Sequence, residues 1–305
     1  MYNPPVRRAV IDIGTNTLLL LIVEVAADGG LTRVIDWCRF GRLGQGLDAA
    51  GQLHPDAIDR SLAICREYAA AIAAHGATRV DVIATQALRE AGNAAAFTEP
   101  AAAILGAPIT TIAGEREAEL AFAAAARSLP ALAGQAFVVA DVGGGSTEVI
   151  VTDGARVVSA VSVPIGAVRL AERHLRHDPP TAEDAAALAA DIDAHVDRLA
   201  LPMGVPLVAS AGTATTLAAL DLELAAYDPD RVHGHALAPA VIDGWTARLL
   251  AASTAERRAL RGMEAPRADV IPAGAAIFAR LAARLHAPSV VVCDRGIRWG
   301  LAYSA

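Results

Sequence analysis

Short apolar runs alternate with longer segments of helical periodicity along this chain, and the two halves repeat the same order. Each half opens with three apolar runs that predict strands. In the first half the predicted strands cover 8–13, 17–25, 31–39, 79–84 and 108–112, and the helical segments cover 55–75, 87–105 and 115–128. In the second half the strands cover 136–142, 146–152, 155–163, 205–210 and 289–293, and the helices cover 166–174, 181–200, 213–222, 239–252, 254–261, 269–286 and the residues from 295. This order predicts an α/β protein in which each half is a mixed sheet covered by helices.

A polar, glycine-containing turn separates the first two predicted strands of each half. The first turn reads Asp-Ile-Gly-Thr-Asn-Thr over 12–17, and the second reads Asp-Val-Gly-Gly-Gly-Ser-Thr-Glu over 141–148. Glycines in such a turn can adopt positive φ and leave backbone amides open to an anion. An ordinary hairpin explains either copy alone. The pair, at a spacing of about one lobe, favours two phosphate-binding hairpins on related lobes that face each other across a cleft.

The length of the chain predicts two domains. A chain of 305 residues exceeds the usual size of a single hydrophobic core, and 54% of the residues are hydrophobic. We therefore expect an N-terminal lobe over residues 1–124 and a C-terminal lobe over residues 125–305. The segment 225–235, which contains His233 and His235, is expected to be irregular. We interpret the two histidines as exposed polar residues or local hydrogen-bonding groups rather than as metal ligands.

Charge narrows the range of ligands. The net charge of −7 argues against nucleic-acid binding by a basic surface. All 26 basic side chains are arginines. The chemistry of a Walker-A, Schiff-base or protein-kinase lysine is therefore excluded, and side-chain binding of phosphate depends on the planar arginine fork.

The chain lacks the features of a membrane or secreted protein. It begins without an apolar signal segment, and no apolar run approaches the roughly 18 residues of a membrane span. The cysteines, Cys38, Cys65 and Cys293, show no metal-ligand spacing. We expect a reduced, cytoplasmic protein.

Several residues suit phosphate chemistry. Backbone amides and polar side chains of the two turns are candidates to hold phosphate oxygens: Gly14, Thr15, Asn16, Thr17, Gly143, Gly144, Gly145, Ser146 and Thr147. Gly212 and Thr213 open a predicted helix after a strand, which is typical of an anion-binding helix N-terminus. Arg89 is a candidate phosphate clamp, although a solvated cation on a short helix would also explain it. Arg169 is a second candidate cation, although it could form a structural ion pair.

Carboxylates supply the remaining chemistry. Hydrolysis of a phosphoanhydride needs a water that attacks phosphorus in line and a carboxylate that orients the water and accepts its proton. Glu117, in the first turn of a helix at the predicted junction of the lobes, suits this role, although acidic residues also favour a helix N-terminus for electrostatic reasons. Asp141 is the best candidate ligand for Mg²⁺, with Mn²⁺ as the alternative ion, and Glu148 and Asp12 are further candidates.

Eight segments, taken in order, resemble the exopolyphosphatase and guanosine-pentaphosphate phosphatase (Ppx/GppA) family, which belongs to the superfamily of actin, sugar kinases and heat-shock ATPases. They are the two turns, Ala84–Ala91 with Asn93, Gly114–Leu120, Gly166–Leu170, Ala211–Thr216, Arg267–Phe278 and Gly296–Gly300. Individually they are weak, but in this order over nearly the whole chain they are specific. The resemblance implies two ribonuclease-H-like lobes with an interlobe cleft, and it places the catalytic glutamate at Glu117.

The resemblance also implies an activity. We expect a Mg²⁺-dependent exopolyphosphatase that removes the terminal phosphate of inorganic polyphosphate. A guanosine pentaphosphate 5′-phosphohydrolase is the close alternative, although no aromatic slot for guanine is evident. An ATP-dependent phosphotransferase and a non-enzymatic nucleotide switch also remain open.

The chain departs from the family pattern in three places. It reads Thr17-Leu18-Leu19-Leu20 where many relatives carry a basic residue or histidine, and Arg116 stands beside Glu117. It resembles short family members, which lack the C-terminal HD-like region. That difference favours shorter polyphosphates or nucleotides and leaves a homodimer open.

Overall fold

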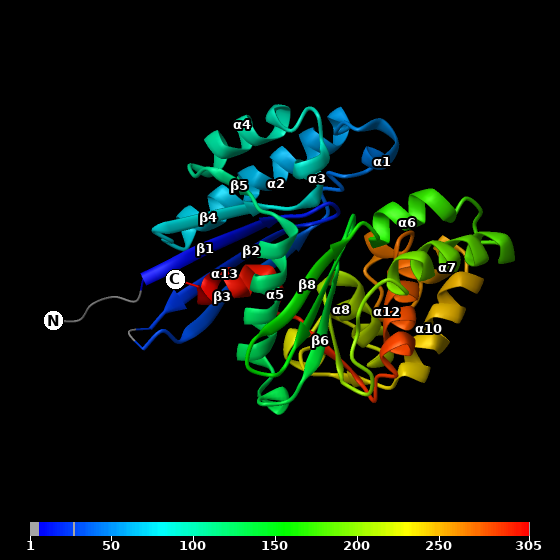
Figure 1. Ribbon diagram of the computed structural model, residues 1–305. Helices are drawn as coiled ribbons and strands as arrows, with labels where there is room; N and C mark the ends of the chain where they lie inside the picture. The colour runs from blue at the N-terminus through cyan, green and yellow to red at the C-terminus, as the bar shows by residue number, and fades with distance from the viewer. Residues whose placement is uncertain (1–5, 27, 305) are drawn as a thin grey trace. The chain divides into compact units, whose positions relative to one another are not determined.

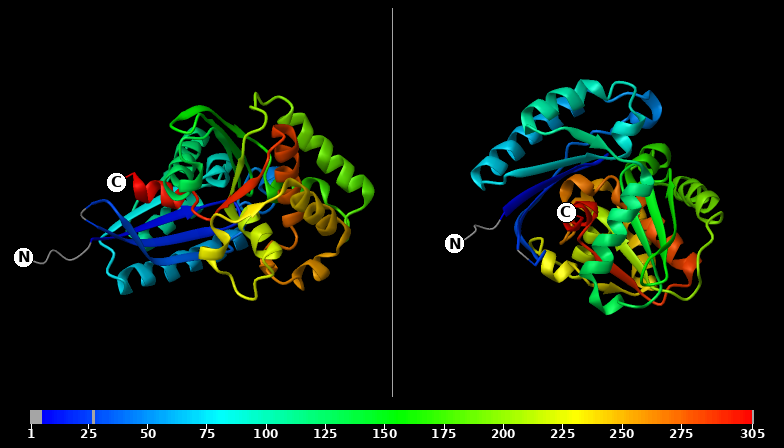
Figure 2. Two further views of the ribbon diagram at one scale, coloured as in Figure 1. Left: turned by 90° about the horizontal axis from the view of Figure 1, so that it is seen from below. Right: turned by 60° about the vertical axis from the view of Figure 1, so that its left-hand side comes forward.

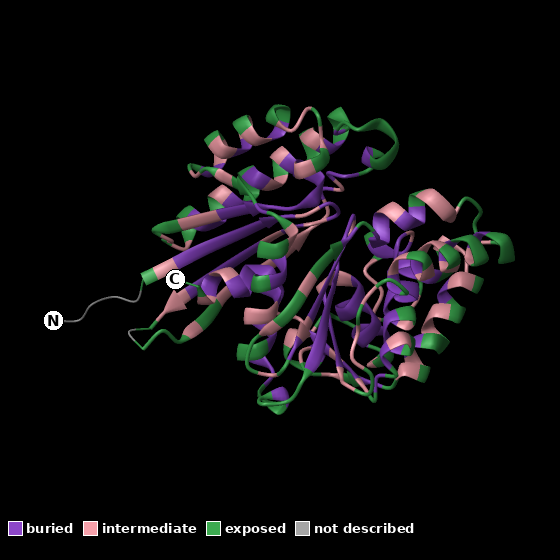
Figure 3. Ribbon diagram, in the orientation of Figure 1, coloured by how far each residue is buried: buried purple, intermediate pink, exposed green. Residues whose placement is uncertain are grey.

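The computed structural model describes residues 6–26 and 28–304 and divides into two compact units. The first unit comprises Met1–Leu120 with Ile297–Ala305, and the second comprises Ala121–Gly296. Each unit contains one mixed sheet with helices packed on it (Figure 1). Buried residues concentrate in the strands and on the sheet-facing sides of the helices (Figure 3).

The sheet of the first unit joins an antiparallel meander to two parallel strands. Its strands are β1 (Val6–Ile13), β2 (Leu18–Val25), β3 (Leu31–Arg39), β4 (Arg79–Ala84) and β5 (Ile109–Thr111), in the spatial order β3-β2-β1-β4-β5. The strands β1, β4 and β5 are parallel to one another. Their carboxyl ends therefore meet at one edge of the sheet.

Two long helices cover one face of this sheet. They are α2 (Pro55–Ala74) and α4 (Ala95–Leu105), and Tyr68 and Phe97 from these helices pack with Ile11 and Leu20 in one buried cluster. The Tyr68 hydroxyl is satisfied by donating to Leu18 O at 2.7 Å. The remaining helices before the unit boundary are α1 (Leu47–Ala50), α3 (Gln86–Glu90) and the first part of α5 (Gly114–Ser128).

The last helix, α13 (Ile297–Tyr303), packs on β1 and β2 on the opposite face from α2 and α4 (Figure 2). Arg298 Nε and Nη2 donate to Asp36 Oδ1 and Oδ2 at 2.9 and 3.0 Å, and Arg8 Nη1 donates to Ala302 O at 3.0 Å. These bonds join β3 and β1 to α13. The structure therefore corrects the expected lobes of 1–124 and 125–305, because the division follows Leu120 and the final helix belongs to the first unit.

The sheet of the second unit has the same arrangement with one added strand. Its strands are β6 (Phe137–Val142), β7 (Thr147–Thr152), β8 (Val157–Val163), β9 (Leu207–Ser210), β10 (Ala236–Leu237) and β11 (Val290–Cys293), in the order β10-β11-β9-β6-β7-β8. The meander β6 to β8 corresponds to β1 to β3, and the parallel strands β9 and β11 correspond to β4 and β5. This repetition confirms the predicted α/β fold of two ribonuclease-H-like lobes.

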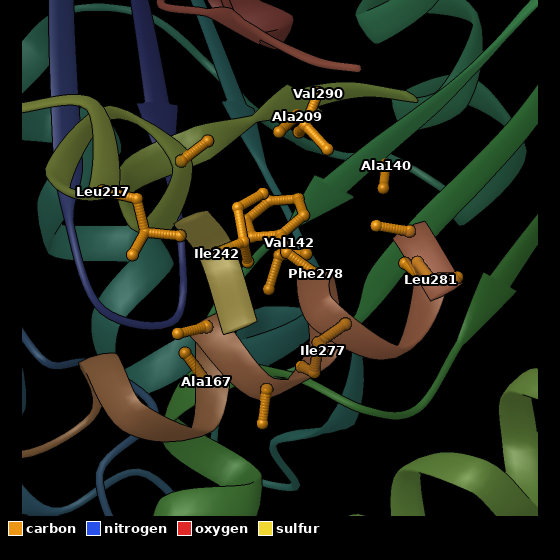
Figure 4. Close-up of a cluster of buried hydrophobic side chains, with 14 of the residues drawn as sticks. Ala140, Val142, Ala167, Ala209, Leu217, Ile242, Ile277, Phe278, Leu281 and Val290 are labelled. Carbon is orange, nitrogen blue, oxygen red and sulfur yellow. The ribbon is translucent and has the colours of Figure 1, made fainter. Parts of the chain in front are cut away.

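Helices form the core of the second unit with one face of its sheet. The helices of this unit after α5 are η1 (Pro130–Leu132), α6 (Ala167–His174), α7 (Ala182–Val196), α8 (Ala211–Asp221), α9 (Pro229–Val232), α10 (Pro239–Ala251), α11 (Thr254–Arg258), η2 (Ala265–Arg267) and α12 (Ile271–Leu285). Phe278 of α12 lies in the middle of the buried cluster with Leu217, Ile242 and Val142 (Figure 4). The opposite face of the sheet packs on α5, where the Phe122 and Phe137 rings stack.

The observed elements follow the predicted ones closely, and the differences are confined to short elements, among them α1, η1 and η2, which were not predicted. The segment expected to be irregular contains the short helix α9 and leads into β10. Asp228 begins α9 by accepting hydrogen bonds from the N–H groups of Asp230 and Arg231, and Pro229 follows it at the first helical position, which suits its fixed φ. None of the helices formed by the described residues has the length and apolar content of a membrane span.

The three cysteines are free thiols in different environments. Burial raises the pKa of Cys65 and of Cys293 to about 12, whereas Cys38 is only partly buried. We expect iodoacetamide at pH 8 to alkylate the native protein at Cys38 alone, because the reagent attacks an accessible thiolate. Mass spectrometry should count one modification on the native chain and three after denaturation. Rapid native labelling of Cys65 or Cys293 would contradict the burial described for them.

Candidate active site

The predicted residues of the first unit gather at the carboxyl edge of its parallel strands. Thr85 N–H, just after β4, donates to Ile13 O at the end of β1 at 3.1 Å. Ile112 N–H, just after β5, donates to Ala84 O at 2.9 Å. Three connections therefore start side by side: the first turn, the helix α3 that carries Arg89, and the helix α5 that carries Glu117. This edge is where α/β proteins commonly bind ligands.

The first turn is a tight hairpin closed by its own backbone. Gly14 N–H donates to Thr17 O at 2.9 Å, and a Cβ at Gly14 would lie 3.1 Å from that oxygen. Thr15 and Asn16 are buried, whereas Gly14 and Thr17 are partly exposed. Among the described residues, Asn16 Oδ1 is one of the few buried side-chain oxygens without a hydrogen-bond partner. The hairpin therefore retains unused hydrogen-bonding capacity, as a ligand site requires.

A second loop supports this hairpin, and the sequence reasoning missed it. Arg42 N–H donates to Asn16 O and Gly44 N–H donates to Thr15 O, both at 2.9 Å. Arg42 adopts a positive φ of 50°, and a Cβ at Gly44 would lie 2.3 Å from Thr15 Cγ2. The run Phe-Gly-Arg-Leu-Gly-Gln-Gly over 40–46, rich in glycine, is the signal that could have identified it.

Arg89 and Glu117 contact each other directly. Arg89 Nη1 donates to Glu117 Oε1 and also to Ile112 O, the latter at 2.6 Å. The side chain of Glu117 is 7% exposed and that of Arg89 is 24% exposed. The predicted base and the predicted clamp thus form a largely buried ion pair beside the first hairpin.

The second hairpin repeats the backbone geometry of the first. Gly143 N–H donates to Ser146 O at 2.9 Å, and a Cβ at Gly143 would lie 3.1 Å from that oxygen, the same two values as at Gly14. The expected positive φ is wrong for both turns. Within the described chain, none of the residues with positive φ belongs to either hairpin. Glycine is favoured at positions 14 and 143 because a side chain there would crowd the carbonyl across the turn.

The helix α6 is bound to this hairpin through its first turn. The N–H groups of Ala167, Val168 and Arg169 donate to the carbonyls of Gly143 and Gly144 at 2.8 to 3.0 Å. A Cβ at Gly166 would lie only 2.5 Å from the Gly144 carbonyl group. The guanidinium of Arg169 is therefore carried by a helix whose position depends on the hairpin backbone.

Gly166→Ala should displace α6 from the hairpin. The φ and ψ of Gly166, −151° and 161°, suit any residue, so the expected effect is purely steric. We expect a loss of about 1–3 kcal/mol of stability, the usual range for overpacking, and reduced activity. Gly244→Ala is the matched control, since Gly244 lies within α10 and has open space around its Cβ position. Equal thermal midpoints for the two variants would contradict the close contact.

Asp141 and Glu148 are cross-strand partners in the second unit. They face each other between β6 and β7, and both are buried, with 8% and 2% exposure. Ser162 Oγ donates to Glu148 Oε1 at 2.7 Å, and Ser210, opposite Asp141 on β9, has a buried Oγ without a hydrogen-bond partner. Two adjacent buried carboxylates concentrate negative charge, which a bound cation can neutralise. This oxygen-rich row fits a hard divalent ion.

The three predicted metal ligands are divided between the two units, with Asp141 and Glu148 in the second. Asp12 belongs to the first unit, on the strand position equivalent to that of Asp141. Throughout residues 6–26 and 28–304, no group of three or more His, Cys, Asp or Glu side chains is placed to hold a metal ion. Mg²⁺ commonly keeps several waters and uses one or two protein carboxylates. The Asp141–Glu148 pair is therefore the stronger part of the metal prediction.

The remaining predicted residues of the second unit form hydrogen bonds or packing contacts with the rest of that unit. The Thr147 hydroxyl is fully buried and donates to Ile165 O at 2.6 Å, so it cannot donate to a phosphate while this bond stands. Thr213 packs against Gly274 of α12, and Gly212 lies against the guanidinium of Arg267. His233 Nε2 lies 2.9 Å from Ser128 O and His235 Nε2 lies 2.8 Å from Asp221 Oδ2, in agreement with the interpretation that both are locally hydrogen-bonded.

Comparison with known proteins identifies the family. The model of the Ppx/GppA phosphatase family matches residues 21–305. Exopolyphosphatase 2 of Mycobacterium tuberculosis is 38% identical over 292 residues, which cover 92% of this chain and 91% of that protein. The crystal structure of the Aquifex aeolicus Ppx/GppA family member has a TM-score of 0.82 at 33% identity, with 99% and 97% of the two chains covered. An exopolyphosphatase-like protein reaches a TM-score of 0.93 at 32% identity, with 99% and 98% covered. The chain belongs to the Ppx/GppA phosphatase family.

Proposed function

We propose that this protein is an exopolyphosphatase, which hydrolyses the terminal phosphoanhydride of inorganic polyphosphate and releases orthophosphate. The observation that carries the proposal is the buried Glu117 carboxylate, held against Arg89 at the sheet edge that also bears the first hairpin. A carboxylate beside phosphate-binding groups is what hydrolysis by an activated water needs. The name of the mycobacterial relative supports this choice among the activities of the family.

In this proposal Glu117 orients the attacking water and accepts its proton at a carboxylate oxygen. The first turn of α5 presents the carboxylate, and Glu117 N–H donates to Ala113 O at 3.1 Å, which fixes the start of the helix. The guanidinium of Arg89 and the backbone amides of the hairpins bind phosphoryl oxygens and withdraw charge from the breaking bond. That the two hairpins act on one substrate remains a prediction.

We also propose that Asp141 and Glu148 hold the Mg²⁺ ion of the reaction. Both are buried carboxylates with neighbouring hydroxyl groups, and such oxygen donors are those that Mg²⁺ prefers. When bound, the ion supplies charge neutralisation for the phosphate oxygens. Glu148 is positioned by the hydrogen bond from Ser162 and Asp141 by its place at the end of β6.

A side-by-side assay of phosphate release tests the proposed function. Long-chain polyphosphate, tripolyphosphate, guanosine pentaphosphate and ATP are compared at equal ionic strength with Mg²⁺ present. We expect the highest kcat/KM for polyphosphate, because the described site offers charge and backbone amides rather than an aromatic slot for guanine. A higher value for guanosine pentaphosphate would replace the proposal with a nucleotide phosphohydrolase. Phosphate transfer that requires ATP and an acceptor would replace it with a phosphotransferase.

A further inference from the structure

In this structure the Arg89 guanidinium is already bonded to protein oxygens, so it must change partners to bind a phosphate through the same N–H groups. One terminal nitrogen, Nη1, donates both to Glu117 Oε1 and to Ile112 O. Ile112 directly follows β5, and the bond of its own N–H to Ala84 O fixes its place. The guanidinium is thus anchored on one side by a backbone carbonyl and on the other by the carboxylate proposed as the base.

Glu117 and an incoming phosphate would compete for the N–H donors of Arg89. A guanidinium binds a carboxylate or a phosphate through the same planar N–H fork, with charge-assisted bonds of similar geometry. A phosphoryl group that takes these N–H donors removes them from Glu117. Conversely, an oxygen of Glu117 that accepts from Arg89 has one acceptor site engaged by a cation, which makes it a weaker proton acceptor for the attacking water. The exposed fraction of the Arg89 side chain, 24% against 7% for Glu117, leaves the arginine as the member that an incoming anion can reach.

We propose that the Arg89–Glu117 ion pair is a latch that the substrate opens. A bound phosphoryl group draws the Arg89 guanidinium onto its oxygens, and this exchange releases Glu117 Oε1 to accept the proton of the attacking water. The base becomes available only when an anion occupies the site. This inference rests on the proposed function, and it assigns Arg89 a second task, that of positioning the base.

The latch makes a prediction that is independent of turnover. In the wild-type protein an anion must displace Glu117 from Arg89, so removing the Glu117 charge should tighten anion binding. Simple repulsion between Glu117 and a phosphate also predicts tighter binding. The two explanations differ when Arg89 is absent: repulsion persists without the arginine, whereas competition for its guanidinium does not. A double-mutant cycle separates them.

Binding of inorganic orthophosphate, measured by titration calorimetry, provides the test. We expect Glu117→Gln to bind about tenfold more tightly than wild type, a factor that corresponds to ~1.4 kcal/mol. Arg89→Gln should bind more weakly, and the double variant should match Arg89→Gln within about twofold. The isosteric Glu117→Gln should preserve the fold, and Glu117→Ala provides a second variant with the same expected direction. Glu119→Gln is the control, since Glu119 bonds to Arg116 at 2.7 Å on the exposed side of the same helix.

Two outcomes would overturn the latch. One is an affinity of Glu117→Gln equal to that of wild type, and the other is a gain that persists in the Arg89→Gln background. Either result, obtained with a wild-type protein that hydrolyses polyphosphate, removes the latch and leaves the proposed function intact. If the cycle behaves as expected but the wild type releases no phosphate from polyphosphate, the proposed function fails while the exchange between carboxylate and anion stands.

Discussion

Replacing Glu117 with glutamine should lower the turnover number for phosphate release by at least about 100-fold, the usual scale for loss of a general base. Glutamine keeps the size and shape of the side chain but cannot accept the proton of the attacking water. The amide can still accept from Arg89 Nη1, so we expect the thermal midpoint to change little. Steady-state rates with polyphosphate, together with a thermal melt of the same sample, measure both effects.

The control for this prediction is Glu119→Gln. Glu119 lies two residues further along α5, and its exposed carboxylate bonds to Arg116. The substitution changes the net charge of the helix by the same amount and should leave the turnover number within about twofold of wild type. If Glu117→Gln retains near-full activity, the proton must go elsewhere, and Glu117 has no part in the chemistry.

Removal of divalent metal should abolish turnover. With excess chelator we expect no phosphate release above background, and addition of Mg²⁺ should restore it, because the charge on a terminal phosphoanhydride needs a counter-ion to bind near buried carboxylates. Asp141→Asn should raise the Mg²⁺ concentration needed for half-maximal activity by at least about tenfold, since it removes one of two neighbouring carboxylates. Activity assays over a Mg²⁺ series measure this shift.

An exposed carboxylate of the same unit supplies the comparison. Asp153 bonds to Arg156 and to nearby backbone amides in a surface turn. Asp153→Asn should leave the Mg²⁺ dependence unchanged. Full activity of the wild type in excess chelator would overturn the metal proposal, and an equal shift for both variants would assign the effect to general charge rather than to a site.

Local sequence predicted most of the elements, for a physical reason. Strand and helix periodicity depends on residues that are close neighbours in the sequence. The limits of β1 to β9 and of α2, α5, α6 and α12 therefore agree with the predicted ranges to within a few residues. The exceptions are the short elements α1, η1, α9, β10 and η2. Their few residues give too little periodicity for a pattern, and the pairing of β10 with β11 depends on a strand more than fifty positions away.

In the candidate site, too, features encoded by neighbouring residues could be predicted, whereas features that depend on distant residues could not. The two hairpins could be predicted because each repeats a short motif between apolar runs. The role of their glycines could not, because it depends on the carbonyls of Thr17 and Ser146 rather than on φ. The loop that carries Arg42 was missed because only tertiary folding places its backbone on the first hairpin.

By itself, the sequence of this protein determined its class of fold, the duplication of its lobes, the presence of two related glycine-containing turns and the choice of Glu117 as the catalytic candidate. All of these depend on residue order over short distances or on resemblance along the chain. Only the tertiary structure decided that α13 closes the first unit, that Asp141 and Glu148 are cross-strand partners and that Arg89 bonds to Glu117. The contacts of α13 and the Arg89–Glu117 bond join residues that lie far apart in sequence, whereas Asp141 and Glu148 lie close in sequence and are paired by the register of their hairpin. All of these contacts exist only after each unit has packed its own core.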